Sequence, residues 1–376
     1  MNRRPTPKAG IVAAIGGVLV AVATTAQAGW LFVLAAGVLG LAVSGLVVSH
    51  RLAAAEIVHA FPARARVGEA VAVTMSVRSA ANRRLPLMRV EDRFPAFDPV
   101  AVASEPIRAG AAAAVELTRV AVARGVFEGG SAELSTGAPF GLTRTKRKTD
   151  VRSRLIVHPA WTELRTFPLP DTPAATADEA LAAARSGQGE LFAGVRDYRP
   201  GDLRKWVHWR STARTGRLVV REHEEPARSP VVLVLAGELA ASHEDVWETL
   251  VAAAASVGVH ALDEGRPLHC LCPGTVAALD NATRATLLDW CAGVSAPGAA
   301  AVDGVGAAFG RWGRRCAFVI LGPPGADVDE AGAAAQARGA GVTVVYGAGE
   351  EGALAESATR GLVVRPGEEL RACLEG

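Results

Sequence analysis

Cysteine is scarce in this sequence of 376 residues, and no two cysteines form a C-x-x-C motif. The five cysteines lie late in the chain, at Cys270, Cys272, Cys291, Cys316 and Cys373. Their odd number and irregular spacing argue against a disulfide-stapled scaffold and against a zinc site. We therefore expect reduced, partly buried thiols in a cytosolic compartment.

The sequence also lacks the motifs of the common enzyme classes. It has no G-x-x-x-x-G-K-[ST], no H-E-x-x-H, no G-x-S-x-G, and no G-x-G-x-x-G that opens a helix after a strand. Gly322-Pro323-Pro324-Gly325 resembles part of a phosphate loop, but no Lys follows it. These absences predict a protein without catalysis of its own and without a cofactor.

Net charge is only +2, yet the charges are unevenly distributed. Residues 1–230 contain 31 Lys and Arg against 20 Asp and Glu, a net charge of +11, whereas residues 231–376 contain 9 against 18, a net charge of −9. The overall balance argues against a dedicated nucleic-acid binder. The change of sign near residue 230 marks a candidate domain boundary.

Charge is absent from a run of 42 residues, because no Asp, Glu, Lys or Arg occurs from Ala9 to His50. A helix of about 20 residues crosses the hydrocarbon core of a bilayer, so the run suits two spans. We expect membrane helices at about 9–27 and 30–49, within a first domain of residues 1–52.

Basic residues flank this run on both sides and are missing from its middle. Arg3, Arg4 and Lys8 precede it, and Arg51 follows it. The positive-inside rule then predicts a two-span protein of the cell membrane, with both ends and the bulk of the chain in the cytoplasm. Two other interpretations stay open: a buried hairpin in a soluble core, and a signal peptide cleaved at Ala26-Gln27-Ala28.

Residues 53–158 predict a small β-sandwich. Apolar residues alternate with polar ones over Val67–Val77, Arg89–Arg93 and Val115–Val122, and clusters of Ala, Gly, Asn and Pro separate these runs. Several short strands at this spacing are typical of a sandwich.

A basic run ends the same region. It contains one acid, Asp150, among six cations: Arg144, Lys146, Arg147, Lys148, Arg152 and Arg154. Either the run lies against anionic lipid head groups, or it is a solvated strand edge that charge keeps from aggregating.

Residues 231–376 alternate between apolar strands and helices. We expect strands at Val231–Leu235, Leu268–Cys272, Cys316–Leu321, Val342–Tyr346 and Gly361–Val364, and helices from Ser242 to about Glu264, at Ala282–Ala292 and at Asp327–Arg338. This order predicts an α/β domain with a doubly wound, mostly parallel sheet.

Between these domains, residues 159–230 read as a linker followed by a dense basic and aromatic stretch. Asp202 follows Pro200-Gly201 and predicts the cap of a helix over Leu203–Arg214, and Arg217–Glu222 then predicts a strand. Trp206, Trp209 and Ala213 would share one face of that helix.

This stretch permits two interpretations. Arg–Asp pairs and a Trp face can lock an irregular loop onto a sheet, or they can form a recognition surface for a partner or an anion. For catalysis, His208 would be a general base without a nucleophile in view. We expect Arg196, Asp202, Arg204 and Arg214 to form one network of ion pairs and hydrogen bonds.

The pattern R-x-Y-x-x-G-D-x-R-x-x-x-x-W-x-x-x-A-R in this stretch resembles the signature of the domain-of-unknown-function 58 family. The matching residues are Arg196, Tyr198, Gly201, Asp202, Arg204, Trp209, Ala213 and Arg214, followed by Gly216 and Leu218. Two shorter elements are similar to that family as well: Arg124-Gly125-Val126-Phe127, and Pro139-Phe140-Gly141-Leu142, in which Ala138 replaces the usual Asp.

The resemblance implies a membrane-anchored protein whose C-terminal domain is similar to von Willebrand factor A. It also implies a partner, because members are typically encoded beside MoxR-type AAA+ ATPases and often beside transglutaminase-like membrane proteins. One departure concerns metal: the D-x-S-x-S that binds Mg²⁺ in such domains is replaced by Ala236-Gly237-Glu238-Leu239-Ala240. We therefore expect no metal at that position.

Together these observations predict a membrane-tethered cytoplasmic adaptor or assembly protein that partners a MoxR-type AAA+ ATPase and contacts membrane lipid but not nucleic acid. One alternative is a hydrolase or ligand-binding enzyme that uses Asp202, His208 and the signature arginines. A third interpretation is RNA binding through the Arg and Trp residues of 196–217.

Overall fold

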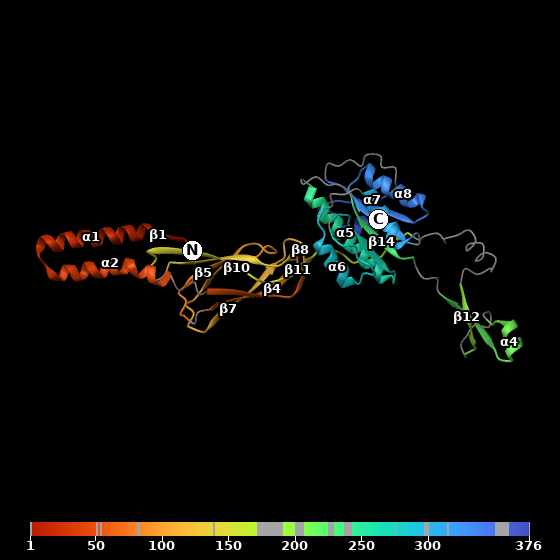
Figure 1. Cartoon of the computed structure of the whole chain (residues 1–376), viewed down its shortest axis with the longest axis horizontal. Helices are drawn as coiled ribbons and strands as arrows, with labels where there is room; N and C mark the ends of the chain where they lie inside the picture. The colour runs from red at the N-terminus through yellow and green to blue at the C-terminus, as the bar shows by residue number, and fades with distance from the viewer. Residues whose placement is uncertain are drawn as a thin grey trace. The chain divides into compact units, whose positions relative to one another are not determined.

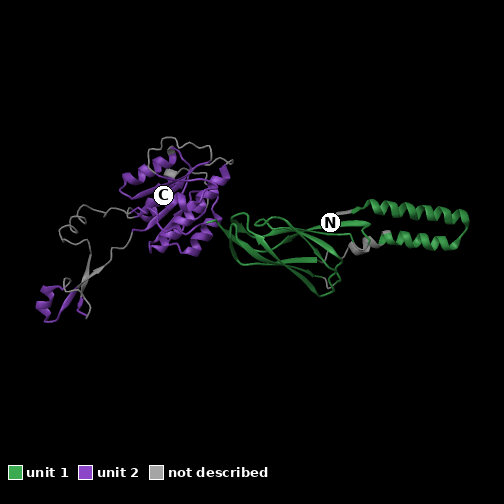
Figure 2. Ribbon diagram, turned by 180° about the vertical axis from the view of Figure 1, so that it is seen from behind, with its two compact units in different colours: residues 1–160 green, residues 161–376 purple. Residues whose placement is uncertain are grey.

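The computed structural model forms two compact units, Met1–Ala160 and Trp161–Gly376 (Figure 2). It describes residues 2–49, 52, 55–80, 83–137, 140–170, 191–199, 207–224, 229–236, 243–274, 276–296, 301–313, 316–349 and 361–375.

Unit 1 begins with a short strand and two apolar helices, β1 (Asn2–Pro5), α1 (Pro7–Ala26) and α2 (Gly29–Ser49). Pro7 suits the first position of α1, where its missing N–H would have no helical acceptor. α1 is long and apolar enough to cross a membrane, and the apolar helix counted over the described part of α2, Gly29–Leu41, is shorter. The expected pair of apolar helices is thus confirmed.

The two helices lie side by side as a hairpin (Figure 1). A Cβ on Gly16 would stand 2.9 Å from Leu39 Cγ, so glycine lets the helices approach closely there. Few residues are buried between them, whereas Ile11 and Val33 are 61% and 74% exposed. The hairpin therefore has an apolar surface that no described part of the chain covers.

The rest of unit 1 consists of strands in three sheets. The strands are β2 (Ala55–Ala60), β3 (Arg64–Arg66), β4 (Ala70–Ser79), β5 (Met88–Arg93), β6 (Val100–Ser104), β7 (Ala112–Val120), β8 (Gly125–Phe127), β9 (Gly130–Thr136), β10 (Thr143–Val151) and β11 (Leu155–His158). Their orders are β1-β10-β9-β5-β6, β2-β4-β7 and β3-β11-β8.

The predicted alternation on β4 is confirmed, because Val71, Val73, Met75 and Val77 are all buried. Met75 and Val77 share a core with Val90, Leu134 and other residues of the five-stranded sheet. The five-stranded sheet and the β2-β4-β7 sheet therefore pack against one another. The strand begins at Ala70 and not at Val67, since Gly68 turns the chain with φ +81°.

Four of the six cations of the basic run lie on β10, and Arg152 and Arg154 follow it. The first half of this strand is not a free edge. β1 pairs with β10 on one side and β9 pairs with it on the other. The interpretation of the run as a sheet edge is therefore wrong for Thr143–Lys146. β1 itself was not predicted.

Unit 2 contains an α/β domain whose elements alternate as expected. They are β14 (Val231–Leu235), α5 (Glu244–Asp263), β15 (Leu268–Leu271), α6 (Arg284–Gly293), α7 (Ala301–Trp312), β16 (Ala317–Gly322), α8 (Ala326–Ala337), β17 (Val342–Gly347), β18 (Leu362–Val364) and α9 (Leu370–Glu375). The predicted strands and helices are confirmed to within about two residues. α7 and α9 were not predicted.

All neighbouring strands of this domain are parallel, in the order β15-β14-β16-β17-β18. Alternate residues of β14 enter two different cores: Leu233 packs with α5, α6 and α9, and Val234 packs with α7 and α8. Helices thus cover both faces, which is the doubly wound arrangement.

The start of the expected linker is packed onto this domain. Thr162 N donates to Ser256 Oγ at 3.0 Å, Phe167 is buried, and Arg266 Nη2 donates to the carbonyl of Pro170 at 2.9 Å. The first part of the predicted linker, up to residue 170, is thus in contact with the α/β domain, and residues 171–190 lie outside the described part.

The cysteines are free, and four of them are buried in the α/β domain, as expected. Burial raises the pKa of the Cys270 thiol well above its usual value. A thiol held protonated in this way is a weak nucleophile, so Cys270 is a packing residue.

Candidate functional site

The basic and aromatic stretch folds as a hairpin with a helix in its connection (Figure 1). Strands β12 (Leu191–Asp197) and β13 (Val219–Glu224) are antiparallel, and α4 (Trp209–Thr215) lies between them in the chain. We call the described residues of 191–224 the signature module.

A small apolar centre and backbone hydrogen bonds hold the module together. Val207, Val219 and Val220 are buried, and Val207 forms a β-bridge with Val220. The backbone N–H of His208 donates to the carbonyl of Val219 at 2.8 Å, and that of Tyr198 donates to Leu218 at 2.9 Å. The segments on either side of α4 are thus fixed to β13.

The predicted helix start is wrong. Val207 pairs as a strand residue, so the helix begins at Trp209 and not at Leu203. His208 is the N-cap, because its Nδ1 accepts from the backbone N–H of Ser211, and Asp202 lies outside the described residues. Gly216, at φ 67°, ends the helix in the left-handed conformation that favours glycine.

The predicted site residues divide between the module and the undescribed part of the chain. Arg196 is on β12, Tyr198 follows that strand, and α4 contains Trp209, Ala213 and Arg214. The others, Gly201, Asp202 and Arg204, lie outside the described residues. The proposed network around Asp202 stays a prediction, and one described contact of Arg196 is with the carbonyl of Asp197, at 3.3 Å.

Trp209 and Ala213, which were expected to share one face of the helix with Trp206, are both exposed, and Trp206 lies outside the described residues. Trp209 is 66% exposed and Leu218 is 47% exposed, and Ala213, one turn after Trp209, is exposed as well. Isolated exposed apolar side chains are common in folded proteins, so the weight of this observation comes from an exposed Trp and an exposed Leu within one small module.

Cations surround this exposed apolar surface. Arg210, Arg214 and Arg217 are exposed, and among the described residues no carboxylate forms an ion pair with them. A guanidinium is a planar donor that suits carboxylates and phosphates. An indole with several arginines around it is the composition expected of a protein-binding surface.

His208 contacts a hydroxyl, which bears on the catalytic alternative. Its Nδ1 lies 2.7 Å from Ser211 Oγ and also accepts from the Ser211 N–H, at 3.3 Å. Both contacts close the first turn of α4. The pair is therefore explained as a helix cap and is not by itself a nucleophile with its base.

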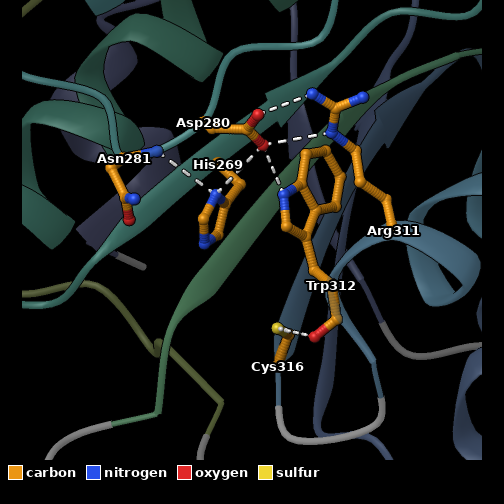
Figure 3. Close-up of polar contacts among 6 residues, drawn as sticks. All are labelled: His269, Asp280, Asn281, Arg311, Trp312 and Cys316. Carbon is orange, nitrogen blue, oxygen red and sulfur yellow. Dashed lines mark hydrogen bonds and ion pairs between the residues drawn. The ribbon is translucent and has the colours of Figure 1, made fainter.

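A second polar cluster, which the sequence did not indicate, lies in the α/β domain (Figure 3). The carboxylate of Asp280 accepts from Arg311 Nε at 3.1 Å, Arg311 Nη2 at 2.5 Å and Trp312 Nε1 at 2.6 Å. The ring of His269 stacks on Trp312 with centroids 5.0 Å apart. The Asn281 N–H donates to His269 Nδ1 at 3.3 Å.

The pKa shifts in this cluster are those expected of groups that stabilise the fold. Hydrogen bonds from Arg311 and Trp312 lower the pKa of Asp280 to about 2, and burial lowers the pKa of His269. His269 is near the start of β15, and Trp312 precedes β16. Ligands in open α/β sheets bind at the opposite, carboxyl edge, so we assign this cluster to stability.

The carboxyl edge of the sheet is closely packed where the metal motif was expected. A Cβ on Gly322 would stand 2.4 Å from the carbonyl oxygen of Ala236. The end of β16 therefore leaves no room for a side chain beside the residue that follows β14. Glu238 lies outside the described residues. Over the described ranges, no group of three or more His, Cys, Asp or Glu could hold a metal ion. The expectation of no metal stays a prediction.

Residues 194–272 match the family model described as "Protein of unknown function DUF58". The match begins in β12 and ends just after β15, so it joins the signature module to the first strands of the α/β domain. This agrees with the resemblance found in the signature pattern. No curated protein matches the chain in sequence.

Solved structures show only weak similarity. The CARDB domain of a Pyrococcus furiosus protein is 8% identical, covers 27% of this chain and 86% of its own, and has a TM-score of 0.19. The bacterial hydrophobin BslA is 8% identical over 28% of this chain and 95% of its own, with a TM-score of 0.21. A Vibrio harveyi exo-β-N-acetylglucosaminidase is 8% identical over 72% of this chain and 58% of its own, also with a TM-score of 0.21.

Proposed function

Residues 194–272 are a DUF58 domain, and from this premise we propose that the protein is a membrane-tethered cytoplasmic adaptor that docks a MoxR-type AAA+ ATPase. In this proposal the chain has no catalysis of its own. The β region is a sandwich next to the inner leaflet, and residues 231–376 form a von Willebrand A-like domain without its metal site. A transglutaminase-like membrane protein is a second candidate partner.

The surface of the helical hairpin supports the membrane anchor. Apolar side chains are exposed all around α1 and over the described part of α2, including Val18 and Leu34. A helix that is apolar on every side is stable in a protein core or in a bilayer, and none of the residues that the structure describes forms a core around these two. We infer that α1 and α2 both span the membrane.

The exposed Trp209 carries the docking part of the proposal. Tryptophan and arginine are the residues most enriched among those that dominate binding energy at interfaces. The cations beside Trp209 favour a partner surface rich in carboxylates. The acidic C-terminal domain offers a second face of opposite charge to the same partner.

The test is recovery of the ATPase with the full chain from crosslinked membranes. Trp209→Ala should reduce recovery of a MoxR-type ATPase by about tenfold or more, since loss of a dominant interface residue costs about 2 kcal/mol. Leu87→Ala is the matched control, because Leu87 is 55% exposed in unit 1, outside the DUF58 domain. Equal recovery with both variants would contradict the proposal.

The second candidate function is a hydrolase or ligand-binding enzyme that uses Asp202, His208 and the signature arginines. The 2.7 Å contact of His208 with Ser211 Oγ is the observation in its favour. A turnover that His208→Ala abolishes and Trp209→Ala preserves would select this function over the adaptor.

A further inference from the structure

The strand before α1 is part of the five-stranded sheet, and this fixes the base of the anchor to the β region. In the β1–β10 ladder, Arg4 is directly opposite Arg144, and Pro5 is opposite Thr143. Thr6 then donates from its N–H to the carbonyl of Leu142 at 2.9 Å, and α1 begins at Pro7.

The other end of the hairpin is tied to the same strand. Arg147 Nη1 donates to the carbonyls of Leu52 at 3.0 Å and Ala55 at 2.8 Å, on the segment that follows α2. Both chain ends of the hairpin are thus held by β10. These contacts fix the solvent-exposed face of the five-stranded sheet, which we call the outer face, relative to the two helices.

The registers divide that outer face into rows. Alternate residues of β10, including Arg144 and Lys146, are exposed, and residues directly opposite one another in a ladder project to the same face. The first row, next to α1, contains Arg4 and Arg144. The second row contains Lys146, Ser135, Arg89 and Ala103.

The acids of this face lie farther from the helices. The third row contains Lys148, Glu133, Glu91 and Ala101, and the fourth contains Asp150, Ser131 and Arg93. The two rows next to α1 therefore contain four cations and no acid, whereas the next two contain two cations and three acids.

Arg4 and Arg144 form an unusual pair. Like charges directly opposite one another in a ladder are destabilising. Both side chains are exposed, and among the described residues neither has an ion pair with a carboxylate. None of the undescribed residues of unit 1 is acidic. An anion between the two guanidinium groups would remove the repulsion.

We propose that Arg4 and Arg144, supported by Lys8 in the first turn of α1 and by Arg89, bind the phosphate of anionic phospholipid head groups. Lys146 is already paired with the carboxylate of Glu133 in the third row, so its charge contributes less. The inference rests on the proposed membrane anchor. A strand rises about 3.3 Å per residue, so Arg4 lies about 10 Å before the start of α1. The head-group region adds only about 5–7 Å to each side of the hydrocarbon core, so Arg4 would lie a few ångströms beyond it and within one Debye length of its charges.

The lipid is favoured over a soluble anion because the site adjoins the anchor. A bilayer with anionic lipids presents phosphates at high local density beside the first row, and each cation near such a surface contributes about a fivefold change in affinity. The site then sets the depth and orientation of the β region at the inner leaflet.

The test is native mass spectrometry of the full chain in neutral detergent, titrated with phosphatidylglycerol or phosphatidylcholine. The chain should retain phosphatidylglycerol at least tenfold more tightly. Arg4→Gln with Arg144→Gln should weaken phosphatidylglycerol binding about 25-fold and leave phosphatidylcholine binding unchanged. Arg144→Lys should keep most of the binding, which controls for folding.

The matched control is Lys148→Gln with Arg93→Gln, which removes two cations from the outer rows of the same face and should change binding less than twofold. Equal retention of both lipids, equal loss in both double variants, or displacement by millimolar inorganic phosphate would overturn the inference. Carbonate extraction separates the two proposals. A chain that is extracted from membranes refutes the anchor, whereas a retained chain without lipid preference refutes only the head-group site.

Discussion

A buried cluster of charged and titratable side chains joins the five-stranded sheet of unit 1 to the β2-β4-β7 sheet. His59 on β2 and Arg119 on β7 belong to one sheet, and Asp92 on β5 belongs to the other. Arg119 donates to the carboxylate of Asp92 and to the carbonyl of Asp98, and its guanidinium lies 4.7 Å from the centroid of Phe97. Buried charges are tolerated when they are paired in this way.

We expect the free energy of unfolding of unit 1 to decrease as the pH is lowered below about 6.5, because of His59. Burial lowers the pKa of His59 more than the charge of Asp92 raises it, with Arg119 lowering it further. The unfolded chain therefore takes up a proton at a pH where the folded chain does not, and the free energy of unfolding decreases as pH falls through that interval. Hydrogen exchange of β5 amides in the full chain measures it.

His59→Phe should remove this pH dependence between pH 7 and pH 5.5, while His158→Gln should keep it. A dependence of equal slope in His59→Phe would show that another group is responsible.

Asp280 has the opposite dependence on pH. Its lowered pKa means that its ion pair with Arg311 stabilises the folded state above the usual carboxyl pKa of 3.8, and that this contribution is lost as pH falls toward about 2. A double-mutant cycle of Asp280→Asn and Arg311→Gln, followed by thermal unfolding, should give a coupling at pH 7 that disappears near pH 2. No coupling at pH 7 would contradict the structural role given to this cluster.

Elements with strong apolar patterns could be predicted, and those that depend on distant partners could not. The apolar residues of β14 are continuous and all buried, and those of α5 are buried except Leu262, which is half-buried. α7 contains Gly304, Gly306 and Gly310, which lower its intrinsic helix propensity, so only packing against β14 and α8 reveals it. β1 is a strand because β10 pairs with it, not because of its own residues.

The same limit explains what was missed at the candidate sites. The residues of the signature module could be named from their pattern, but the exposure of Trp209 depends on where α4 begins. In the second cluster, Asp280 contacts Arg311 and Trp312, which are 31 and 32 positions later in the chain and form the last two residues of α7. Since α7 was not predicted, neither was the contact.

The close approach of β14 and β16 predicts the effect of one added methyl group. Gly322→Ala should destabilise the α/β domain by about 1–3 kcal/mol, because the new Cβ would meet the Ala236 carbonyl, which is backbone and cannot rotate away. Gly306→Ala in α7 should instead stabilise it by about 0.5–1 kcal/mol, since nothing lies within 4 Å of that position. Denaturant unfolding of both variants tests the pair, and a neutral Gly322→Ala would refute the packing.

The chain combines an apolar hairpin, a β region and an α/β domain. The topology of the hairpin in the membrane is testable. We expect a reporter fused after Gly376 to be active only in the cytoplasm, and one inserted at Ala26 to be active only outside. The basic residues before and after the hairpin favour this orientation. Reversed activities, or a mature chain that begins after Ala28, would contradict the two-span anchor.

Photocrosslinking in living cells tests the central claim most directly. A photoreactive amino acid in place of Trp209 should give one major crosslinked product, which mass spectrometry identifies as a MoxR-type AAA+ ATPase. The same amino acid in place of Leu87 should not give it, and Arg214→Glu should reduce it because the partner surface is expected to be acidic. If position 209 crosslinks to no ATPase while the chain is intact in the membrane, the signature module is not a docking surface for that partner and the account is wrong.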